Sequence, residues 1–238
     1  MGIINFEGET YVAFVDIYGF KHFMRDKDRI DEVVYEFYDC GYTILKSQNL
    51  DTNEPSPIQG IFVSDCGILF VSRDHQNLSL MEKSHSLNHL LNVVKDMNIH
   101  MIEHDVILTT SIAYGSLSCS EKAEFRGISK NPFYGDAYLN AFMDNEDPQV
   151  KIKPGECRIV KKNLPNDLIT EESKLNWDNF ALLRKKRNDG LRVYFYWMVN
   201  EKSKITEFNK VYSKFEAERY KKMAELIKDF TFRNNNKK

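Results

Sequence analysis

The chain has little cysteine, no long apolar run and no excess of one charge, and each shortage excludes a class of protein. Its four cysteines show no Cys-x-x-Cys spacing and its N-terminus shows no signal peptide, so reduced thiols in a cytoplasmic protein are expected. No apolar run approaches the roughly 20 residues that span a bilayer, so no membrane segment is expected. Lys and Arg total 33 against 35 Asp and Glu, a net charge of -2 that argues against nucleic acid or an anionic membrane as a partner.

The chain alternates between strand-like and helix-like segments, and its 238 residues with 42% hydrophobic side chains can supply one substantial core. Strands are expected at Tyr11–Phe20, in a run that breaks at Gly19, at Gly60–Val71 as a hairpin, and at Val106–Tyr114, Cys157–Lys161 and Leu191–Met198. The strand from Val106 is expected to end at Gly115. Helices are expected at Asp28–Ser47, with Asp28 as a cap, and at Gln76–Asn98, Ala137–Met143 and Ile205–Phe230.

The order of these elements, with strand, helix, hairpin, helix and strand, predicts an α+β domain rather than a doubly wound sheet. We expect residues 1–200 to form this domain. We expect residues 201–238 to form a helical extension, because apolar positions there alternate with lysine and glutamate as in an amphipathic helix. The extension is expected to pack on the domain or on a partner subunit.

Two aspartates interrupt otherwise apolar strand runs. Asp16 lies near the end of the first run, and Asp65 lies at the tip of the predicted hairpin. Taken singly, each has an ordinary interpretation, as an acid that caps a helix or forms a turn before glycine. A carboxylate beside a buried strand must otherwise be solvated, paired or bound to a metal. If the hairpin returns beside the first strand, the two acids meet and form a site for divalent cations.

The residues that follow Asp16 offer further groups for such a site. The carbonyl of Ile17 is a hard oxygen ligand. The amides of Tyr18, Gly19 and Phe20 open toward a helix and can receive phosphate oxygens. The pattern therefore predicts a site that holds metals against a triphosphate.

Several segments resemble, in the same order, the class III nucleotide cyclases, and in particular the bacterial pyrimidine cyclases of the Pycsar antiphage system. The resemblance covers about Tyr11 to Trp197, and it rests on the order of the motifs rather than on any single one. The matching motifs are Asp16–Lys21 and Ser64–Asp65 for the metals, Ile112–Gly115 for a crossing strand, Tyr134–Phe142 for a short helix, and Arg158–Val160 and Asp189–Tyr196 for the late strands.

The resemblance implies a ferredoxin-like core, a central mostly antiparallel sheet with flanking helices, that works as a head-to-tail homodimer with active sites at the interface. Asp16, Asp65 and the Ile17 carbonyl would hold two Mg²⁺ or Mn²⁺ ions. The residues from Tyr18 to Lys21 would bind the triphosphate of UTP or CTP, and Phe62 is a candidate neighbour of the base. The product would be a 3′,5′-cyclic nucleotide that a separate effector protein reads in antiphage defence.

Departures from the cyclase pattern bear on the substrate. Purine cyclases carry an arginine four residues after the asparagine that corresponds to Asn140, and here that position is Asp144. Adenylyl cyclases read the base with a lysine where this chain has Ile61. Both departures favour a pyrimidine, with UTP ahead of CTP because uridylate activity is the commoner one in the resembling family.

The cation that stabilises the transferred phosphate is also unassigned, because Thr109–Ser111 stands where pyrimidine cyclases often have an Arg-Gly pair. The missing arginine leaves open an alternative, a degenerate cyclase-fold protein that binds nucleotide or a partner without turnover. The candidate cations are Lys21, Arg126, Lys130 and the cluster Arg184–Arg187.

A different signature is His100–His104, which fits the His-x-x-Glu-His pattern of inverted zinc metallopeptidases. That motif needs a stable helix and one more ligand, whereas here it is predicted to fall between the end of a helix and the strand that starts at Val106. His85 and His89 share the spacing but lack the glutamate of the zinc protease motif. All four histidines are interpreted as exposed or helix-terminal, and a zinc hydrolase is the third hypothesis.

Overall fold

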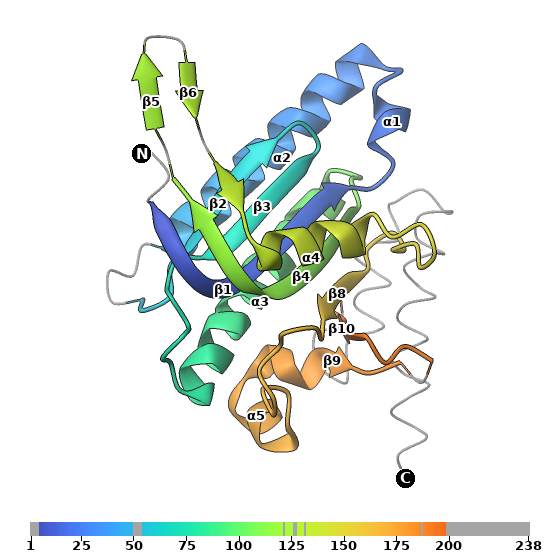
Figure 1. Ribbon diagram of the computed structural model, residues 1–238. Helices are drawn as coiled ribbons and strands as arrows, with labels where there is room; N and C mark the ends of the chain where they lie inside the picture. Colours follow the sequence, from blue (N-terminus) through green and yellow to red (C-terminus); the bar gives the residue numbers. More distant parts are fainter. Residues whose placement is uncertain are drawn as a thin grey trace.

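Within the residues that the structure describes, the main sheet has eight strands and is mostly antiparallel. The computed structural model describes residues 5–49, 54–120, 122–125, 128–130, 132–186 and 188–198. The strands of the main sheet are β1 (Phe6–Ile17), β2 (Ile58–Val63), β3 (Cys66–Val71), β4 (Leu108–Cys119), β7 (Phe133–Tyr134), β8 (Cys157–Val160), β9 (Leu183–Arg184) and β10 (Arg192–Phe195). They lie in the order β2-β3-β1-β4-β8-β10-β9, with β7 beside β4 (Figure 1). Within the described residues β4 and β8 pair in parallel and the other neighbours are antiparallel, which confirms the predicted α+β class.

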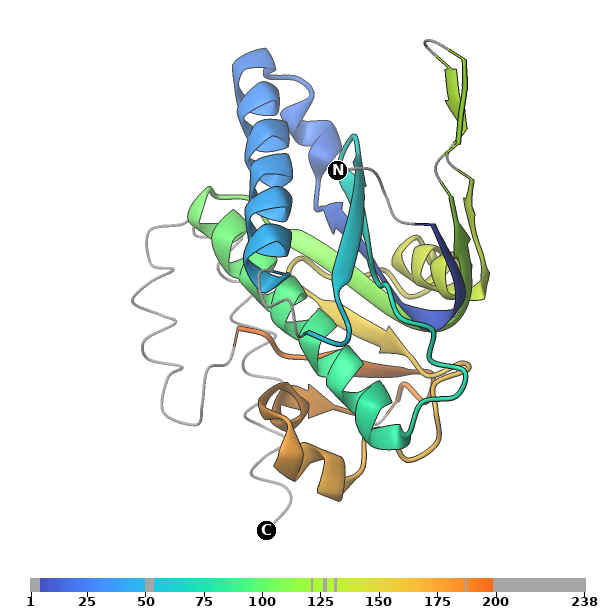
Figure 2. The same cartoon turned by 90° about the vertical axis from the view of Figure 1, so that its left-hand side faces the viewer.

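Helices cover the two faces of this sheet unequally. The helices are α1 (Phe20–Phe23), α2 (Lys27–Gln48), α3 (Leu80–Glu103), α4 (Asp136–Asn145), α5 (Glu171–Asn176) and the 3-10 helix η1 (Asp178–Leu182). Figure 2 shows α2 and α3 on one side of the sheet and α4 on the other. We call the side under α2 and α3 the closed face and the side under α4 the open face. A separate hairpin of β5 (Lys122–Phe125) and β6 (Ile128–Lys130) projects beyond the sheet.

The helix ends differ from the sequence-based expectation, because side-chain caps fix them. Asp26, and not Asp28, accepts the amide of Arg29 and caps α2, so the predicted cap was wrong. Ser79 and Glu82 form a reciprocal capping box that starts α3. The helix then continues beyond the predicted end at Asn98, because Met101 and Ile102 still pack into the core.

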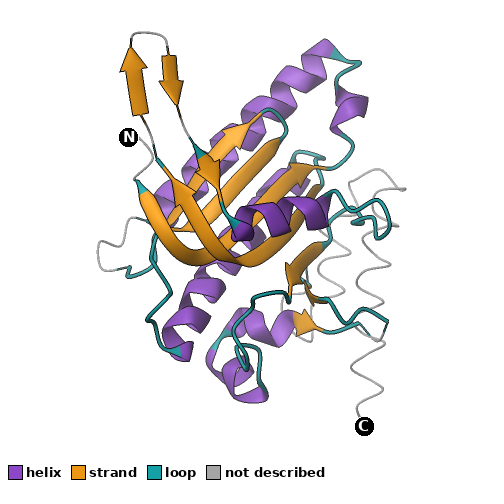
Figure 3. Cartoon of the chain, viewed as in Figure 1, coloured by secondary structure: helices purple, strands orange, loops and turns teal. Residues whose placement is uncertain are grey.

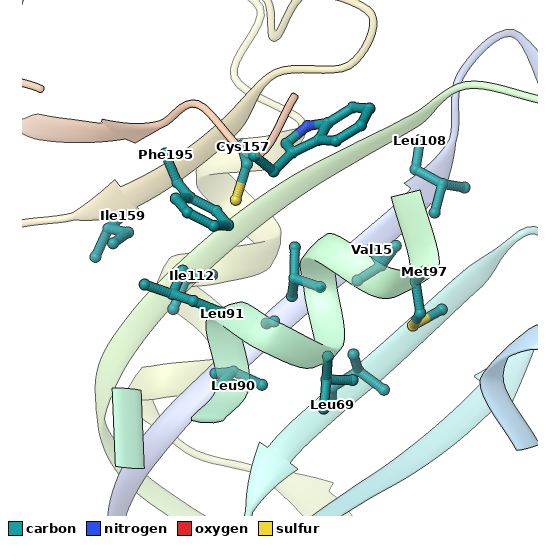
Figure 4. Close-up of a cluster of buried hydrophobic side chains, with 14 of the residues drawn as sticks. Val15, Leu69, Leu90, Leu91, Met97, Leu108, Ile112, Cys157, Ile159 and Phe195 are labelled. Atoms are coloured by element: carbon teal, nitrogen blue, oxygen red, sulfur yellow. The ribbon is translucent and has the colours of Figure 1, made fainter. Parts of the chain in front are cut away.

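The core of the closed face is apolar and continuous. Leu90, Leu91 and Met97 of α3 are fully buried and point toward the strands (Figure 4). On the strand side they meet a second set of buried side chains, Val15, Leu69, Leu108, Ile112, Cys157, Ile159 and Phe195. Burial of one leucine of this kind contributes about 1.5–3 kcal/mol, so this layer carries much of the stability of the domain.

Strand β4 does not end at Gly115 as predicted but runs on to Cys119. Glycine is needed here for close approach, because a Cβ on Gly115 would lie 3.2 Å from the amide nitrogen of Ala137 in α4. At Gly135 a Cβ would lie 2.2 Å from the carbonyl oxygen of Ser116, and its φ of 143° also favours glycine. These two glycines let α4 begin directly against the strand.

The predicted helical extension over 201–238 lies outside the described residues. The boundary between a domain of residues 1–200 and that extension therefore stays a prediction. None of the described helices combines the length and the apolar character that crossing a bilayer requires.

Candidate active site

Asp16 and Asp65 are brought together by the pairing of β1 with the hairpin of β2 and β3. Asp16 is opposite Cys66 in the register of β1 and β3, and the amide of Ile17 donates to the carbonyl of Asp65 at 3.0 Å. The predicted return of the hairpin beside the first strand is thus confirmed. Ser64, before Asp65 in the hairpin turn, has a positive φ of 56°, a conformation that is uncommon for a residue with a side chain.

Side-chain alternation places Asp16 on the open face. Val12 and Phe14 precede it at intervals of two and pack in the cluster under α4, and Cys66 contacts the same cluster. Ile17, the next residue, points the other way and is buried in the core of the closed face. Among the described elements, α4 is the helix that Figure 3 shows crossing the strands on this side.

A third carboxylate near Asp16 was not anticipated from the sequence. Glu146 is the C-terminal cap residue of α4, and its charge acts on Asp16 together with that of Asp65. Burial, and then the negative charges of Asp65 and Glu146, raise the pKa of Asp16 to about 7. Burial and the same acids raise the pKa of the Cys66 thiol to about 11. Only the tertiary contact between α4 and β1 reveals Glu146, because it lies far from both aspartates in the sequence.

This group of acids fits a divalent cation of the hard type. Mg²⁺ and Mn²⁺ prefer oxygen ligands, and the carboxylates of Asp16, Asp65 and Glu146 can supply them. The pKa of Asp16 is raised first by burial and then by repulsion from Asp65 and Glu146, and a bound cation would favour the ionised carboxylate against both. Glu146 also lies at the negative end of the α4 dipole, which favours a cation.

The loop after Asp16 differs in one respect from the expected phosphate loop. The amide of Tyr18 donates to the carbonyl of Ile107 at 2.8 Å, so its assignment as a phosphate donor was wrong. Gly19 adopts a left-handed conformation with φ of 75° and starts α1. The amides of Gly19 and Phe20 precede the first internal hydrogen bond of α1, and the side chain of Lys21 is exposed beside them.

Phe62 does not lie on the side of Asp16. It pairs with Gly67, which is opposite Val15, and these residues face the closed side of the sheet. Its ring packs edge-on against Phe37 of α2, in the space that the absent side chain of Gly41 leaves. Phe62 is therefore part of the core, and its assignment as a neighbour of the base is not supported.

Asp144 anchors an ion-pair network in place of the arginine that purine cyclases carry. Its carboxylate is buried, accepts from Ser111, and pairs with Arg158 at 3.1 Å and with Arg192 at 2.5 Å. Asn140, one turn earlier in α4, instead accepts a hydrogen bond from Lys162 at 3.2 Å. Lys162 was not among the predicted cations, and only this contact distinguishes it from other exposed lysines.

The predicted cations of the late cluster are engaged locally. The guanidinium of Arg184 donates to the carbonyls of Ala181 and Leu183, and Lys186 lies over the ring of Tyr194. Arg126 and Arg187 lie outside the described residues, and the side chain of Lys130 does as well.

The histidine motif proves to be helical, which overturns the reason for discounting it. Because α3 extends to Glu103, His100 lies in its last turn and His104 is its C-terminal cap residue. The interpretation of all four histidines as exposed or helix-terminal was wrong for His89, which is buried in the body of α3.

Comparison with known proteins identifies the fold. The guanylate cyclase domain of RhGC from Catenaria anguillulae, solved in complex with GTP, is 11% identical with a TM-score of 0.52, over 81% of this chain and 97% of that one. The adenylyl cyclase CyaB from P. aeruginosa is 12% identical with a TM-score of 0.51, over 81% of this chain and 95% of that one. The chain has the class III nucleotide cyclase fold.

A further structure with the cyclase fold is the non-canonical dimeric guanylyl cyclase domain of the RhoGC fusion protein from Blastocladiella emersonii. It is 11% identical with a TM-score of 0.51, over 81% of this chain and 97% of that one. No family model matches the sequence, and no curated protein matches it. At these identities the similarity establishes the cyclase fold, and activity has to be argued from the residues.

Proposed function

We propose that this protein is a metal-dependent nucleotide cyclase that converts a ribonucleoside triphosphate to a 3′,5′-cyclic monophosphate and pyrophosphate. The observation that supports the proposal is that Asp16 lies beside the Asp65 turn in a cyclase fold and feels the charges of both Asp65 and Glu146. A half-buried carboxylate such as Asp16, repelled by two further acids, is costly to ionise unless a cation offsets the charge.

In this proposal Asp16 and Asp65 hold Mg²⁺ or Mn²⁺, two ions per site, with the carbonyl of Ile17 as a further ligand. The ions supply activation of the ribose 3′-hydroxyl and neutralisation of the triphosphate and of the leaving pyrophosphate. The amides of Gly19 and Phe20 and the ammonium of Lys21 receive phosphate oxygens at the start of α1. Asp16 accepts metal in competition with a proton, because its pKa is raised to about 7.

We propose a pyrimidine nucleotide as the substrate, with UTP ahead of CTP. Ile61 is opposite Ile68 and so shares the face of Asp16, where an apolar side chain cannot read adenine as a lysine does. Asp144 offers a carboxylate, already paired with arginines, where purine cyclases place their arginine. A role in antiphage defence, with a separate effector protein that reads the product, rests on the sequence resemblance to the Pycsar cyclases.

We also propose that two copies assemble through the open face, with active sites at their interface. Apolar side chains that stay exposed among the described residues of this face support this proposal. Val63 of the hairpin and Leu139 and Met143 of α4 are more than half exposed, at 57%, 52% and 59%. A second copy would bury them and bring Asn140 and Lys162 of α4 and its flank toward the carboxylates of its partner.

The test is an assay of the purified chain with each of the four ribonucleoside triphosphates and Mn²⁺ or Mg²⁺, with cyclic monophosphate and pyrophosphate as readouts. We expect product from a pyrimidine nucleotide and none after Asp16→Ala or Asp65→Ala. The matched control is Asp28→Asn, an exposed acid of α2 on the closed side, which should retain activity. Product from a purine alone would overturn the pyrimidine assignment.

A second candidate is a degenerate cyclase-fold protein that binds nucleotide without turnover. It is favoured by the Asp144 network, which holds a carboxylate in place of a catalytic arginine. Metal-dependent binding of a triphosphate without any product, in the same preparation, would establish this candidate and overturn the enzyme.

A further inference from the structure

We propose a second, independent metal site, formed by Glu36 of α2 with His100 and His104 of α3, that takes Zn²⁺ or a similar borderline divalent ion. In the part of the chain that the structure describes, each of these residues offers a ligand atom, and the atoms all lie within 4.8 Å of one another. This group, the histidine site, shares no residue with the carboxylates around Asp16. The proposal does not depend on cyclase activity.

The distances are those of ligands that face one ion and not of hydrogen-bonded groups. Glu36 Oε2 lies 3.8 Å from His100 Nε2 and 3.6 Å from His104 Nδ1, both beyond hydrogen-bond length. Donors on one tetrahedral zinc lie about 3.3 Å apart, given bonds of about 2.0–2.2 Å. Small side-chain rotations therefore suffice to bring the carboxylate oxygen and both nitrogens onto a common centre.

The two imidazoles are already aligned. Their rings stack with centroids 4.9 Å apart and planes at 27°, because the residues are one helical turn apart. His100 Nε2 is removed from solvent and has no hydrogen-bond partner. A buried ring nitrogen without a partner costs free energy, and a metal bond would satisfy it.

The other histidine pair of the same helix shows what a satisfied arrangement looks like. His85 and His89 also lie near one carboxylate, Glu54, at 3.0 Å and 3.7 Å, but there each histidine has a hydrogen-bond partner. His85 Nε2 lies 3.0 Å from Glu54 Oε1, and His89 Nδ1 bonds the carbonyl of Ser56 at 2.9 Å. The ring nitrogens of His85 and His89 are thus engaged in hydrogen bonds. In the histidine site, the carboxylate oxygen and the ring nitrogens face one another beyond hydrogen-bond length.

The donor set and the local charge both favour a borderline cation. Two imidazoles and one carboxylate are the protein ligands of many zinc sites, with a fourth position left for water or another ligand. The charges of Glu36, Asp39 and Asp96 all act on the nearby thiol of Cys40, so the surroundings are negative. Arg29, which reaches the end of α3, is paired with Glu32 at 2.7 Å.

A metal here would join α2 to the end of α3. Arg29 already links the two by donating to the carbonyl of His104 at 2.6 Å. From His104 the chain passes to Ile107, whose carbonyl holds the amide of Tyr18. The histidine site is thus separated by one short loop from the segment that starts α1.

The experiment is a titration of the full metal-free chain with ZnCl₂ in excess Mg²⁺, followed by calorimetry, and a parallel titration with Co²⁺ followed by its visible absorption. We expect one zinc per chain, and a cobalt spectrum of the intense tetrahedral type. His100→Ala and His104→Ala should each weaken zinc binding by more than the roughly 10–100-fold that loss of an outer-shell partner costs. His85→Ala is the matched control and should bind zinc as the parent does.

Asp16→Ala separates this site from the candidate active site, because zinc binding should survive it. The proposal is overturned if the parent binds no zinc, if Asp16→Ala abolishes zinc binding, or if His85→Ala weakens it as much as His100→Ala. Unfolding of the metal-free variants checks their fold. If His100→Ala does not fold, Glu36→Gln carries the test, and unchanged zinc affinity in that variant would overturn the site.

Discussion

The two faces of the sheet use the same strands for different purposes. On the closed face, β1 contributes Ala13 and Val15 to a core sealed by α2 and α3. On the open face, the same strand contributes Phe14 and then Asp16 on the side that α4 covers. Stability and chemistry are thus divided between alternate residues of one strand, because successive side chains of a strand point to opposite faces.

Removal of the acids of the open face should have the largest effect. We expect Asp16→Ala to lower cyclase turnover by at least about 1,000-fold, or roughly 4 kcal/mol in transition-state free energy, because the metal loses a ligand. The measurement is initial rate with saturating Mn²⁺ and triphosphate. Turnover within tenfold of the parent would break the proposed division between the two faces.

The closed face should respond in stability instead. Leu90→Ala removes a fully buried side chain of α3 and should lower the free energy of unfolding by about 3 kcal/mol, because it leaves a cavity. Leu139→Ala, the matched change on the open face, should cost less than about 0.5 kcal/mol because Leu139 is 52% exposed. Denaturant unfolding at low protein concentration compares the two. Equal losses would show that both faces are closed.

The pH dependence of stability should reveal Asp16. Its pKa is raised to about 7 in the folded chain, so the folded state binds a proton that the unfolded state, with a pKa near 3.8, releases earlier. The contribution of this proton to the free energy of unfolding is fully present below about pH 4. It is lost as the pH rises through about 7. Without metal, the parent should lose about 1–3 kcal/mol more than Asp16→Asn between pH 5 and pH 8.

Denaturant unfolding of both chains in a chelator measures this difference. Added Mg²⁺ should restore stability to the parent at pH 8 and leave Asp16→Asn unchanged. Parallel pH profiles of the two chains would contradict the raised pKa of Asp16.

Lys162 should have the smallest effect of the four. If it supplies positive charge beside Asn140 on the open face, Lys162→Met should lower turnover by about tenfold, or roughly 1.4 kcal/mol, with stability unchanged. Lys161→Met is the neighbouring control, because the ammonium of Lys161 donates to the carbonyl of Gly190. If both variants keep full turnover, the cation has to come from elsewhere.

Much of the fold could be predicted from the sequence, because its signals are local. The runs around Asp16 and Asp65 and the spacing of apolar residues in α2 specify their elements without reference to the rest of the chain. The errors lie where a distant contact decides. The end of α3 depends on packing of Met101, and the continuation of β4 depends on the approach of α4 to Gly115.

The candidate site was predictable only in part, for the same reason. Asp16 and Asp65 are conspicuous because they interrupt apolar runs. Glu146 and Lys162 stand in polar surroundings, where nothing in the sequence distinguishes them from solvated side chains. Phe62 looked available in the sequence, but the register of β2 turns its ring to the closed face.

The sequence by itself determined the α+β class, the strand that carries Asp16 and the hairpin that carries Asp65, because hydrophobic period and turn residues act over short distances. Only the tertiary structure decided which face each side chain occupies and which charges meet there. The register of β1 with β3 sets Asp16 beside the Asp65 turn, the packing of α4 adds Glu146, and the length of α3 carries His100 and His104 to Glu36. These contacts join residues distant in the chain, so they depend on how whole elements pack.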